Sequence, residues 1–409
     1  MIRTKYKVLK LEDIAVNSKN AIVDGPFGSA LKVKDYVDDG IPVLQGKNIS
    51  NFQFNFSDIR YITPQKAQEL IRSKVEVGDI LFVKIGSIGY SAEVTDLNGY
   101  PFAIIPANLA KVSIDYSKVD KNYLLFWLRS DTVVNYLKKN ASKTAQPALS
   151  LGKIKQIPVV MPSLETQKKI SAVLLKAQEL IDKRKAQIEA LDQLTQSVFL
   201  EMFGDPKLNK KNWKKQKLND VCLRKGEYGS GSSAIPYDSG KPRYIRITDI
   251  RDDGSLNDDI VAPSNPDDYE KYRLNEGDIL FARSGATVGK TYLHSEKNGY
   301  CIFAGYLIRF VPDTSKINPK FLFHFTRTQY YKQWVMSKQN TVAQPNINAK
   351  QYGEELFIIC PPLELQNRFA KIVEEIEAEK ELLQKSMVEL QNNFNSLMQR
   401  AFKGELFND

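Results

Sequence analysis

Amide, basic, hydroxyl and aromatic side chains stand close together in several turn-like stretches of the chain. In the first half of the sequence they are Phe27, Ser29, Lys32, Gln45, Lys47, Asn48, Lys84, Ser87, Tyr90 and Gln146. In the second half they are Tyr228, Ser230, Arg243, Arg246, Thr248, Arg283, Ser284, Lys290, Gln344 and Asn346. Arginine can form two hydrogen bonds with guanine, asparagine and glutamine can do so with adenine, and lysine or arginine can bind phosphate. As clusters, these side chains predict a surface that reads DNA.

The inventory for catalysis is much poorer. His294 and His324 are the two histidines, and neither has a metal-ligating neighbour at a familiar spacing. We expect both to be satisfied core or surface residues. No nucleophile elbow and no glycine-rich loop of the methyltransferase type is present. The three cysteines, Cys222, Cys301 and Cys360, are far apart and are expected to be reduced core residues.

Two stretches imitate a catalytic site. The segment 284–291 is similar to a phosphate-binding loop, but it has Ser284 where that loop needs glycine. A helix should follow it, whereas Asn298-Gly299 predicts a turn. The carboxylates around Asp267 and Glu270 are interpreted as an acidic loop. We therefore predict no cofactor site and no metal site in this chain.

The overall charge favours a polyanionic partner. The chain has 409 residues and a net charge of +10, with a pI of about 9.1. The length predicts two or more domains. No apolar run long enough for a transmembrane helix and no secretory signal is found, so a cytoplasmic protein is expected, with nucleic acid as its partner rather than a membrane.

The chain repeats itself. GDILF occurs at 78–82 and at 277–281, Asn98-Gly-Tyr100 returns at 298–300, and Ala145-Gln-Pro147 returns at 343–345. Pro162-Ser-Leu-Glu-Thr-Gln167 likewise has a counterpart at 361–366. Because these matches keep their order at nearly one offset, the chain contains two copies of one unit. The residues shared by the copies are framework types, whereas loop positions such as Gln45 and Arg246 differ.

Each copy has a globular part followed by a long helix. Short β-type runs are predicted at 80–83, 157–160 and 279–282, and helices at 123–137 and 321–335. Apolar residues spaced by three and four mark a coiled-coil seam on each long helix. The predicted pairing residues are Ile170, Leu174, Ile181, Ile188, Leu191, Val198, Phe369, Val373, Ile376, Leu383, Met387, Leu390, Phe394 and Leu397. Arg184 and Lys380 interrupt the seams and are interpreted as solvated breaks. If a pseudo-twofold axis relates the copies, the two helices pair antiparallel.

At this point the motifs match a known family. The chain resembles the specificity subunits of type I restriction–modification systems over its whole length. The resemblance is carried by the GDILF and Pro-x-Leu-Glu-x-Gln segments and by 24–29, 201–206 with Trp213, 244–250 and 401–406. The predicted fold is α+β, with two similar mixed α/β target-recognition domains separated by two long helices that form an antiparallel coiled coil. The domains are expected at 1–162 and 205–362, and the spacer helices at 163–204 and 363–409.

The resemblance implies a non-catalytic subunit. Each target-recognition domain would read one half of a split, asymmetric site in double-stranded DNA. The helices would set the gap between the half-sites and dock two modification subunits. Those subunits use S-adenosylmethionine, and restriction subunits that need ATP and Mg²⁺ would join through the complex. Copy two lacks the Asp-Gly-Pro-Phe-Gly-Ser stretch of copy one, so loops cannot be equated there from sequence.

Two other classes of function compete with this interpretation. An enzyme with its own nuclease or methyltransferase activity would show methyl transfer by the purified chain. A coiled-coil scaffold without a DNA role would show no binding that weakens with salt.

Overall fold

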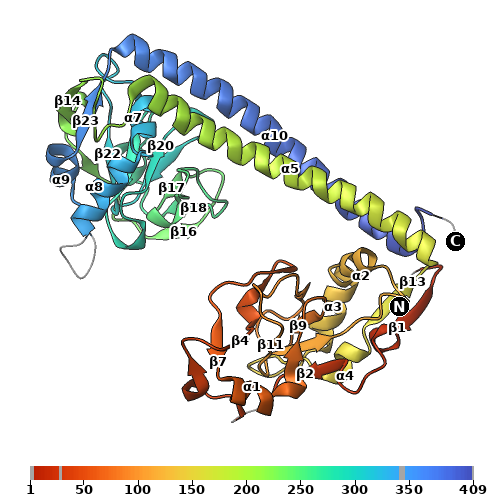
Figure 1. The fold of residues 1–409 in the computed structure, drawn as a ribbon. Helices are drawn as coiled ribbons and strands as arrows, with labels where there is room; N and C mark the ends of the chain where they lie inside the picture. Colours follow the sequence, from red (N-terminus) through yellow and green to blue (C-terminus); the bar gives the residue numbers. More distant parts are fainter. Residues whose placement is uncertain (1–3, 27–29, 340–345, 408–409) are drawn as a thin grey trace. The chain divides into compact units, whose positions relative to one another are not determined.

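The computed structural model describes residues 4–26, 30–339 and 346–407. These residues form two compact units (Figure 1). Unit 1 lies within 1–184 and 386–409, and unit 2 lies within 185–385. Each unit therefore contains one globular part, a piece of the central helix and a piece of the C-terminal helix.

The globular part of unit 1 is built on a four-stranded sheet in the order β10-β9-β12-β2 and a five-stranded sheet in the order β3-β7-β4-β11-β8. Two-stranded pairs β1–β13 and β5–β6 accompany them. The strands are β1 Lys7–Lys10, β2 Ile22–Asp24, β3 Tyr36–Val37, β4 Ile41–Val43, β5 Ile49–Ser50, β6 Gln53–Phe54, β7 Arg60–Ile62, β8 Lys74–Val75, β9 Ile80–Val83, β10 Ser91–Glu93, β11 Ala103–Ile104, β12 Leu109–Val112 and β13 Pro158–Met161. The shorter helices are α1 Pro64–Glu69, α2 Lys121–Leu128, α3 Asp131–Asn140 and α4 Leu151–Lys155.

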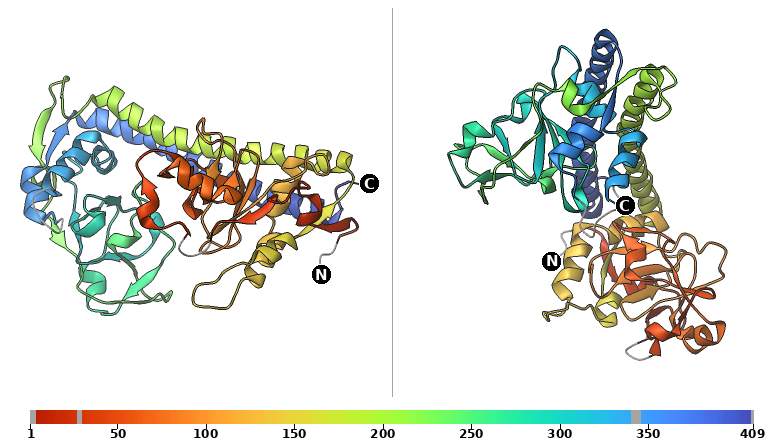
Figure 2. Two further views of the ribbon diagram at one scale, coloured as in Figure 1. Left: turned by 60° about the horizontal axis from the view of Figure 1, so that its bottom comes forward. Right: turned by 90° about the vertical axis from the view of Figure 1, so that its left-hand side faces the viewer.

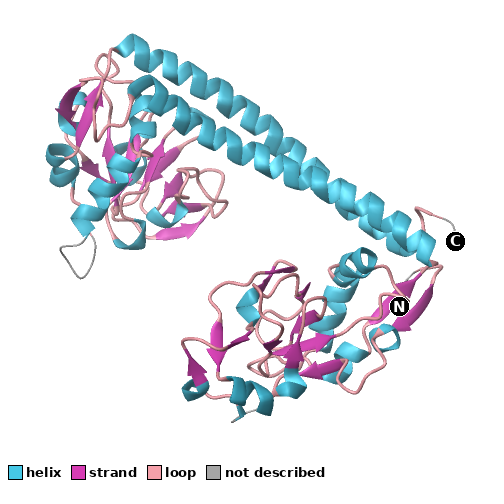
Figure 3. Ribbon diagram, viewed as in Figure 1, coloured by secondary structure: helices cyan, strands magenta, loops and turns pink. Residues whose placement is uncertain are grey.

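Unit 2 repeats this framework (Figure 3). Its four-stranded sheet has the order β15-β22-β19-β20, and the pairs β14–β23, β17–β21 and β16–β18 accompany it. The strands are β14 Lys214–Lys217, β15 Glu227–Tyr228, β16 Ala234–Pro236, β17 Arg243–Ile245, β18 Val261–Pro263, β19 Ile279–Ala282, β20 Thr291–Leu293, β21 Cys301–Phe303, β22 Leu307–Phe310 and β23 Phe357–Cys360. The shorter helices are α6 Asp268–Lys271, α7 Pro319–Phe325, α8 Gln329–Gln339 and α9 Ala349–Glu355.

The two GDILF segments form the buried centres of the two four-stranded sheets. They contribute β9 and β19, whose residues are all buried. β9 lies between β10 and β12, and β19 lies between β20 and β22, with antiparallel pairing throughout. The predicted strands at 80–83 and 279–282 are thus confirmed, and the one predicted at 157–160 is β13, shifted by one residue.

Two long helices, α5 (Leu164–Phe203) and α10 (Leu363–Lys403), connect these parts (Figures 1 and 2). In unit 1, Ile170 and Leu174 near the start of α5 share a core with Phe394 and Ala401 near the end of α10. In unit 2, Phe199 near the end of α5 packs against Phe369 near the start of α10. Within each unit the start of one helix meets the end of the other, so the helices pair antiparallel.

The predicted seam faces inward in the described helices. Its members are either buried or half-buried, and none of the fourteen predicted pairing residues is exposed. Lys380 does not fit the predicted solvated break. Its Nζ lies 2.6 Å from an Asp192 carboxylate oxygen on the other helix, and its side chain is only 20% exposed. The prediction was wrong because an ion pair between the helices can hold a lysine head at the seam. Arg184 is half-buried.

The helices predicted at 123–137 and 321–335 are each two helices, which is a second correction. Ser130 has extended backbone with ψ of 149° and caps the start of α3, so α2 stops before it. In unit 2, the Thr326 and Thr328 hydroxyls donate to the Phe323 and Phe325 carbonyls, 2.6 and 2.7 Å away. Such side-chain bonds to backbone satisfy the last carbonyls of a helix and favour its end.

The described cysteines are all free, with Cys222 and Cys301 buried and Cys360 half-buried. Burial raises the pKa of the Cys301 thiol to about 11. None of the described helices combines the length and apolar character needed to cross a bilayer. The stretch around Asp267 and Glu270, interpreted as an acidic loop, includes the short helix α6.

Candidate nucleic-acid interface

Both globular parts have a glycine turn at an equivalent place, directly after β2 in unit 1 and directly after β15 in unit 2. Asp24 ends β2 opposite Ala110 of β12, and Tyr228 ends β15 opposite Ile308 of β22. The next residue is Gly25 or Gly229. A Cβ on Gly25 would lie 2.1 Å from the Pro106 carbonyl carbon, and one on Gly229 would lie 2.3 Å from the Phe303 carbonyl oxygen. Only glycine permits so close an approach of two backbones.

This turn resolves the apparent loss of the Asp-Gly-Pro-Phe-Gly-Ser stretch in copy two. Gly229 takes the place of Gly25, so Tyr228 takes the place of Asp24. The neighbouring strands agree, because the Lys84 amide donates to the Asn108 carbonyl at 2.8 Å and the Arg283 amide donates to the Tyr306 carbonyl at 3.1 Å. The two globular parts thus present three pairs of equivalent positions on one framework, namely Asp24 and Tyr228, Lys84 and Arg283, and Asn108 and Tyr306. Gln146 and Asn346 lie close to these positions but are not equivalent to each other, because Asn346 bridges to Ser284 as Ala148 bridges to Ile85. We name Asp24, Lys84, Asn108 and Gln146 the Lys84 cluster, and Tyr228, Arg283, Tyr306 and Asn346 the Arg283 cluster.

In the Lys84 cluster the cation is turned inward. The Lys84 Nζ donates to an Asp24 carboxylate oxygen at 2.6 Å, and the two side chains are only 5% and 8% exposed. The predicted DNA contact of Lys84 is therefore corrected, because a buried, paired ammonium cannot meet DNA without breaking this pair. Beside it lies a hollow of about 390 Å³ lined by Asn108, Gln146 and Gly86. The Asn108 Oδ1 is buried there without a hydrogen-bond partner among the described residues.

In the Arg283 cluster the cation is half-buried and lies beside exposed tyrosines. The Arg283 guanidinium lies over the Tyr228 ring, 4.7 Å from its centroid, and its Nε donates to Asn346 Oδ1 at 3.3 Å. The Tyr228 hydroxyl accepts a hydrogen bond from the Ala349 amide at 3.1 Å, which fixes the ring. Tyr228 and Tyr306 are 42% and 62% exposed. The half-buried Arg283 and the exposed Tyr228 and Asn346, all predicted from sequence, are therefore brought together.

Other predicted cations of unit 2 form ion pairs with carboxylates of the segment 249–259. Arg246 bonds to the buried Asp249 at 2.7 Å and to Asp259 at 2.7 Å, and these hydrogen bonds raise the pKa of the Arg246 guanidinium. Lys290 lies 2.8 Å from Asp252, and the Lys290 ammonium lowers the pKa of that carboxyl. The Arg246 guanidinium is thus already paired within its own domain, and its base contact stays a prediction.

Arg243 has a similar role in the fold. Its Nη2 donates to the Asn257 carbonyl at 2.6 Å, so the Arg243 side chain supports the segment 249–259. Two further predicted contacts are also structural. Asn48 is 1% exposed and its Nδ2 donates to the Ser57 carbonyl at 2.9 Å. Ser230 is 1% exposed and its hydroxyl donates to Asp268. Buried amides and hydroxyls need such partners, so neither side chain is presented to a ligand.

The remaining predicted residues fall into three groups. Those with exposed positions are Lys32, Lys47, Ser87, Tyr90, Gln146, Thr248 and Asn346, and Gln45 and Ser284 are half-buried. Lys47 is paired with Asp58. Phe27, Ser29 and Gln344 lie outside the described residues.

Sequence reasoning missed Asn108 and Tyr306, which sit at equivalent positions one residue before the strands β12 and β22. The signal was available, because Leu109 and Leu307 stand at the same offset as the Ala-Gln-Pro repeat. It also missed Asp24 as the partner of Lys84, since a pair separated by 60 residues leaves no local pattern.

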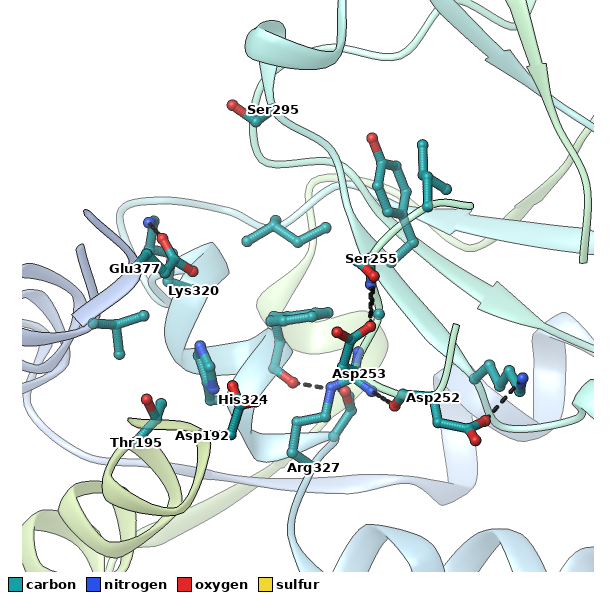
Figure 4. Close-up of a pocket in the computed structure, with 18 of the residues that line it drawn as sticks. Asp192, Thr195, Asp252, Asp253, Ser255, Ser295, Lys320, His324, Arg327 and Glu377 are labelled. Carbon is teal, nitrogen blue, oxygen red and sulfur yellow. Dashed lines mark hydrogen bonds and ion pairs between the residues drawn. The ribbon is translucent and has the colours of Figure 1, made fainter. Parts of the chain in front are cut away.

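A separate cavity of about 1460 Å³ lies within unit 2, where the globular part meets α5 and α10 (Figure 4). Thr195, His324 and Arg327 line it. The His324 Nε2 and the Arg327 Nε are buried without partners among the described residues, which corrects the expectation of a satisfied histidine. Desolvation, with help from Arg327 and Lys320, lowers the pKa of the His324 imidazole to about 3. His294, in contrast, is satisfied by the Tyr292 hydroxyl at 3.1 Å.

Neither the cavity nor the loop at 284–291 forms a recognisable catalytic centre in the described part of the chain. Strand β20 follows the loop directly, where a phosphate-binding loop would lead into a helix. Among the described residues, no three His, Cys, Asp or Glu side chains are grouped so that they could hold a metal ion.

The fold contains two copies of one module, each with its own four-stranded sheet and the shared glycine turn. The chain belongs to the family of the type I restriction modification DNA specificity domain, whose sequence model matches residues 5–190 and 210–392. The MjaIX specificity subunit of a type I restriction enzyme from Methanocaldococcus jannaschii is 23% identical, over 98% of this chain and 93% of that protein. The EcoKI specificity subunit from Escherichia coli is 22% identical, over 90% of this chain and 83% of its own length.

Solved structures show the same fold. A structure from a study of complex assembly and conformational transition of the type I R-M system has a TM-score of 0.57 at 18% identity and covers 98% of both chains. The S subunit of a type I restriction–modification system from M. genitalium has a TM-score of 0.52 at 14% identity, over 99% of this chain and 97% of that chain. The predicted fold class and family are thereby confirmed.

Proposed function

We propose that this chain is the DNA-reading specificity subunit of a type I restriction–modification complex and that each globular part reads one half of a bipartite, asymmetric site. The paired helices set the distance between the half-sites and dock two modification subunits. The chain itself carries out no chemistry. S-adenosylmethionine, ATP and Mg²⁺ bind to the modification and restriction subunits, and the complex works on double-stranded DNA in the cytoplasm.

One observation carries this proposal: the same backbone position displays different hydrogen-bonding chemistry in the two copies. In unit 1 it offers the Asn108 amide, with Gln146 beside the same hollow, whereas in unit 2 it offers the exposed Tyr306 and an Arg283 guanidinium that lies over the exposed Tyr228 ring. A duplicated scaffold with divergent surface groups is what reading two unlike half-sites requires. The family match and the net charge of +10 agree with it.

The test is selection of binding sites from a randomised duplex pool by the full chain assembled with its modification subunit. We expect two enriched blocks of bases that differ from each other and are separated by a constant gap. Affinity for the selected duplex should fall steeply as salt is raised. A single block, or no enrichment, would contradict the bipartite assignment.

The absence of catalysis is tested separately. The purified chain, incubated with selected duplex and labelled S-adenosylmethionine, should transfer no methyl group, and transfer should begin when the modification subunit is added. Methyl transfer by the chain alone would overturn the non-catalytic assignment.

A further inference from the structure

We infer that Arg283 reads a guanine in the half-site recognised by unit 2, and that Lys84 at the equivalent position of unit 1 makes no base contact. This inference rests on the proposed function and names one residue and one base within it. It depends on the geometry of the Arg283 cluster and on the contrast with the Lys84 cluster.

The guanidinium of Arg283 is held from two sides. Its central carbon lies over the Tyr228 ring, 4.7 Å from the ring centroid, and its Nε donates to Asn346 Oδ1 at 3.3 Å. The ring is itself anchored by the Ala349 amide. No described residue accepts a hydrogen bond from Nη1 or Nη2 of Arg283. The plane of the side chain is therefore set in advance, and its two outer nitrogens remain as a pair of donors.

A pair of parallel donors matches one base edge. In the major groove guanine presents two adjacent acceptors, N7 and O6, whereas adenine presents an acceptor beside a donor. Cytosine presents a donor, and thymine an acceptor beside a methyl group. An arginine fork held in one plane thus favours guanine over the other three bases.

A phosphate would also accept two hydrogen bonds, but the comparison between copies favours a base. Phosphate contacts serve any sequence, so a duplicated scaffold would be expected to keep such a contact in both copies. Unit 1 instead has Lys84 at this position, buried against Asp24, and both side chains are at most 8% exposed. The exposed Arg72 guanidinium lies 3.6 Å from the other carboxylate oxygen of Asp24, but Arg72 comes from a different part of the framework. A cation that is half-buried over an exposed tyrosine in one copy and buried in an ion pair in the other is expected of a sequence-reading position.

The experiment compares binding-site selections by the full assembled complex containing wild-type chain, Arg283→Ala or Arg283→Lys. Wild type should enrich guanine at one position in one of the two blocks. At that position it should discriminate against other bases by roughly 5- to 150-fold in Kd, the range of a bidentate contact. Arg283→Ala should abolish the preference at that position only. Arg283→Lys should also lose most of it, because an ammonium lacks the planar fork.

Arg273 supplies the matched control on the same domain. Its guanidinium also lies over a tyrosine, 5.2 Å from the Tyr300 ring, but Glu270 is its ion-pair partner. Arg273→Ala should leave both blocks unchanged. Thermal melting of all variants at the wild-type temperature shows that the domain is intact.

The outcomes separate the inference from the proposed function. If Arg283→Ala weakens binding equally for every sequence, Arg283 contacts phosphate and the inference is overturned. If the selected motif is unchanged, Arg283 makes no DNA contact and the inference is again overturned. If the wild-type complex itself selects no motif, the proposed function fails as well.

Discussion

The Lys84 cluster and the Arg283 cluster occupy the same place on two copies of one scaffold, yet the cation has different partners and a different degree of burial in each. In unit 1 the strand β2 ends at Asp24, and the buried Lys84 ammonium donates a hydrogen bond to the Asp24 carboxylate. In unit 2 the strand β15 ends in Tyr228, which offers a flat ring, and Arg283 lies on that ring at the surface. The residue before the shared glycine decides which of these outcomes follows.

The glycine and the strands around it are common to both units, so the scaffold constrains the backbone and leaves side-chain chemistry free. Gly25 and Gly229 cannot change, because a Cβ at either would collide with backbone. Asp24 and Tyr228 face no such restriction. A duplicated module can therefore acquire a new surface specificity by changing the residues beside an invariant turn.

A second contrast lies where each globular part meets the long helices. In unit 1 Phe126 packs against Phe394 of α10, with ring centroids 6.0 Å apart, and the Arg129 guanidinium covers Phe126 at 3.9 Å. In the repeat, His324 stands for Phe126 and Thr195 of α5 stands for Phe394. These smaller, more polar side chains leave the cavity of unit 2, with Arg327 at its wall. We call this contact between a globular part and the long helices the joint of each unit. The joint is filled by aromatic side chains in unit 1 and contains a cavity in unit 2.

The largest effect should come from breaking the buried ion pair of unit 1. Asp24→Ala would leave Lys84 charged and unpaired in a site where it is 5% exposed. Removing one partner of a buried pair costs about 3–5 kcal/mol of unfolding free energy. Urea titration, followed by hydrogen exchange of peptides that contain β9, measures this loss. Asp24→Ala combined with Lys84→Met should restore much of it, and a loss below about 1 kcal/mol in the single variant would contradict the buried pair.

Phe394→Ala should be nearly as damaging, because it empties the filled joint of unit 1. Phe394 is 6% exposed and contacts both Phe126 and the Arg129 side chain. Truncating a buried phenylalanine costs about 3–5 kcal/mol. Thr195→Ala, at the equivalent position beside the cavity, should cost less than about 1 kcal/mol. Equal losses in the two variants, measured by urea unfolding, would remove the distinction between a filled and a hollow joint.

The hollow joint should also make unit 2 sensitive to acid. The pKa of His324 is about 3 in the fold against 6.5 for a free histidine, because the desolvated ring resists protonation near Arg327 and Lys320. A lowered histidine pKa contributes stability above pH ~6.5 and loses it as the pH falls toward ~3. One proton of difference gives a slope of up to about 1.4 kcal/mol per pH unit in that window.

His324→Phe, which installs the residue of unit 1, isolates this contribution. Because phenylalanine does not titrate, the variant should lose less stability than wild type between pH 6.5 and pH 4. The measurement is the urea midpoint of each protein across this range. Parallel pH profiles for the two proteins would show that His324 is solvated and protonates freely.

Much of the fold could be predicted from the sequence, because repetition and apolar periodicity are local signals. The two GDILF strands and the seam residues of α5 and α10 follow from patterns that burial alone maintains. The breaks at Ser130 and Thr326 could not be predicted in the same way. Apolar periodicity continues through them, whereas the breaks lie at the extended backbone of Ser130 and at Thr326, whose hydroxyl donates to a backbone carbonyl.

The candidate site was harder to predict, because residue type says nothing of whether a cation is already paired. Arg283 and Lys84 look equivalent as basic residues that follow the GDILF strands, yet Arg283 is half-buried over a tyrosine ring and Lys84 is buried in an ion pair. The pairing and burial of these two cations depend on Tyr228 and Asp24, which lie some 60 residues earlier in the chain. The ion pairs of Arg246 with Asp249 and Asp259 leave no local pattern in the sequence for the same reason.

The smallest expected effect concerns the helix pair, where the seam of unit 2 has a lysine and the seam of unit 1 has an isoleucine. Lys380 of α10 corresponds in the repeat to Ile181 of α5, which is 1% exposed in unit 1. Lys380 instead meets Asp192, whose side chain is 53% exposed, so solvent screens their attraction. A double-mutant cycle with Lys380→Ala and Asp192→Ala should give a coupling of about 0.2–1 kcal/mol, smaller in high salt.

Lys380→Ile should then stabilise unit 2 by about 1 kcal/mol, because it adds apolar surface to the seam at the place where unit 1 already has isoleucine. Lys385, paired with Glu381 on the same helix at 2.8 Å and 69% exposed, supplies the control. Lys385→Ile lies outside the seam and should change the urea midpoint little. If Lys380→Ile destabilises the protein by more than the measured coupling, the lysine is a specific requirement of this helix pair and the two seams are not interchangeable.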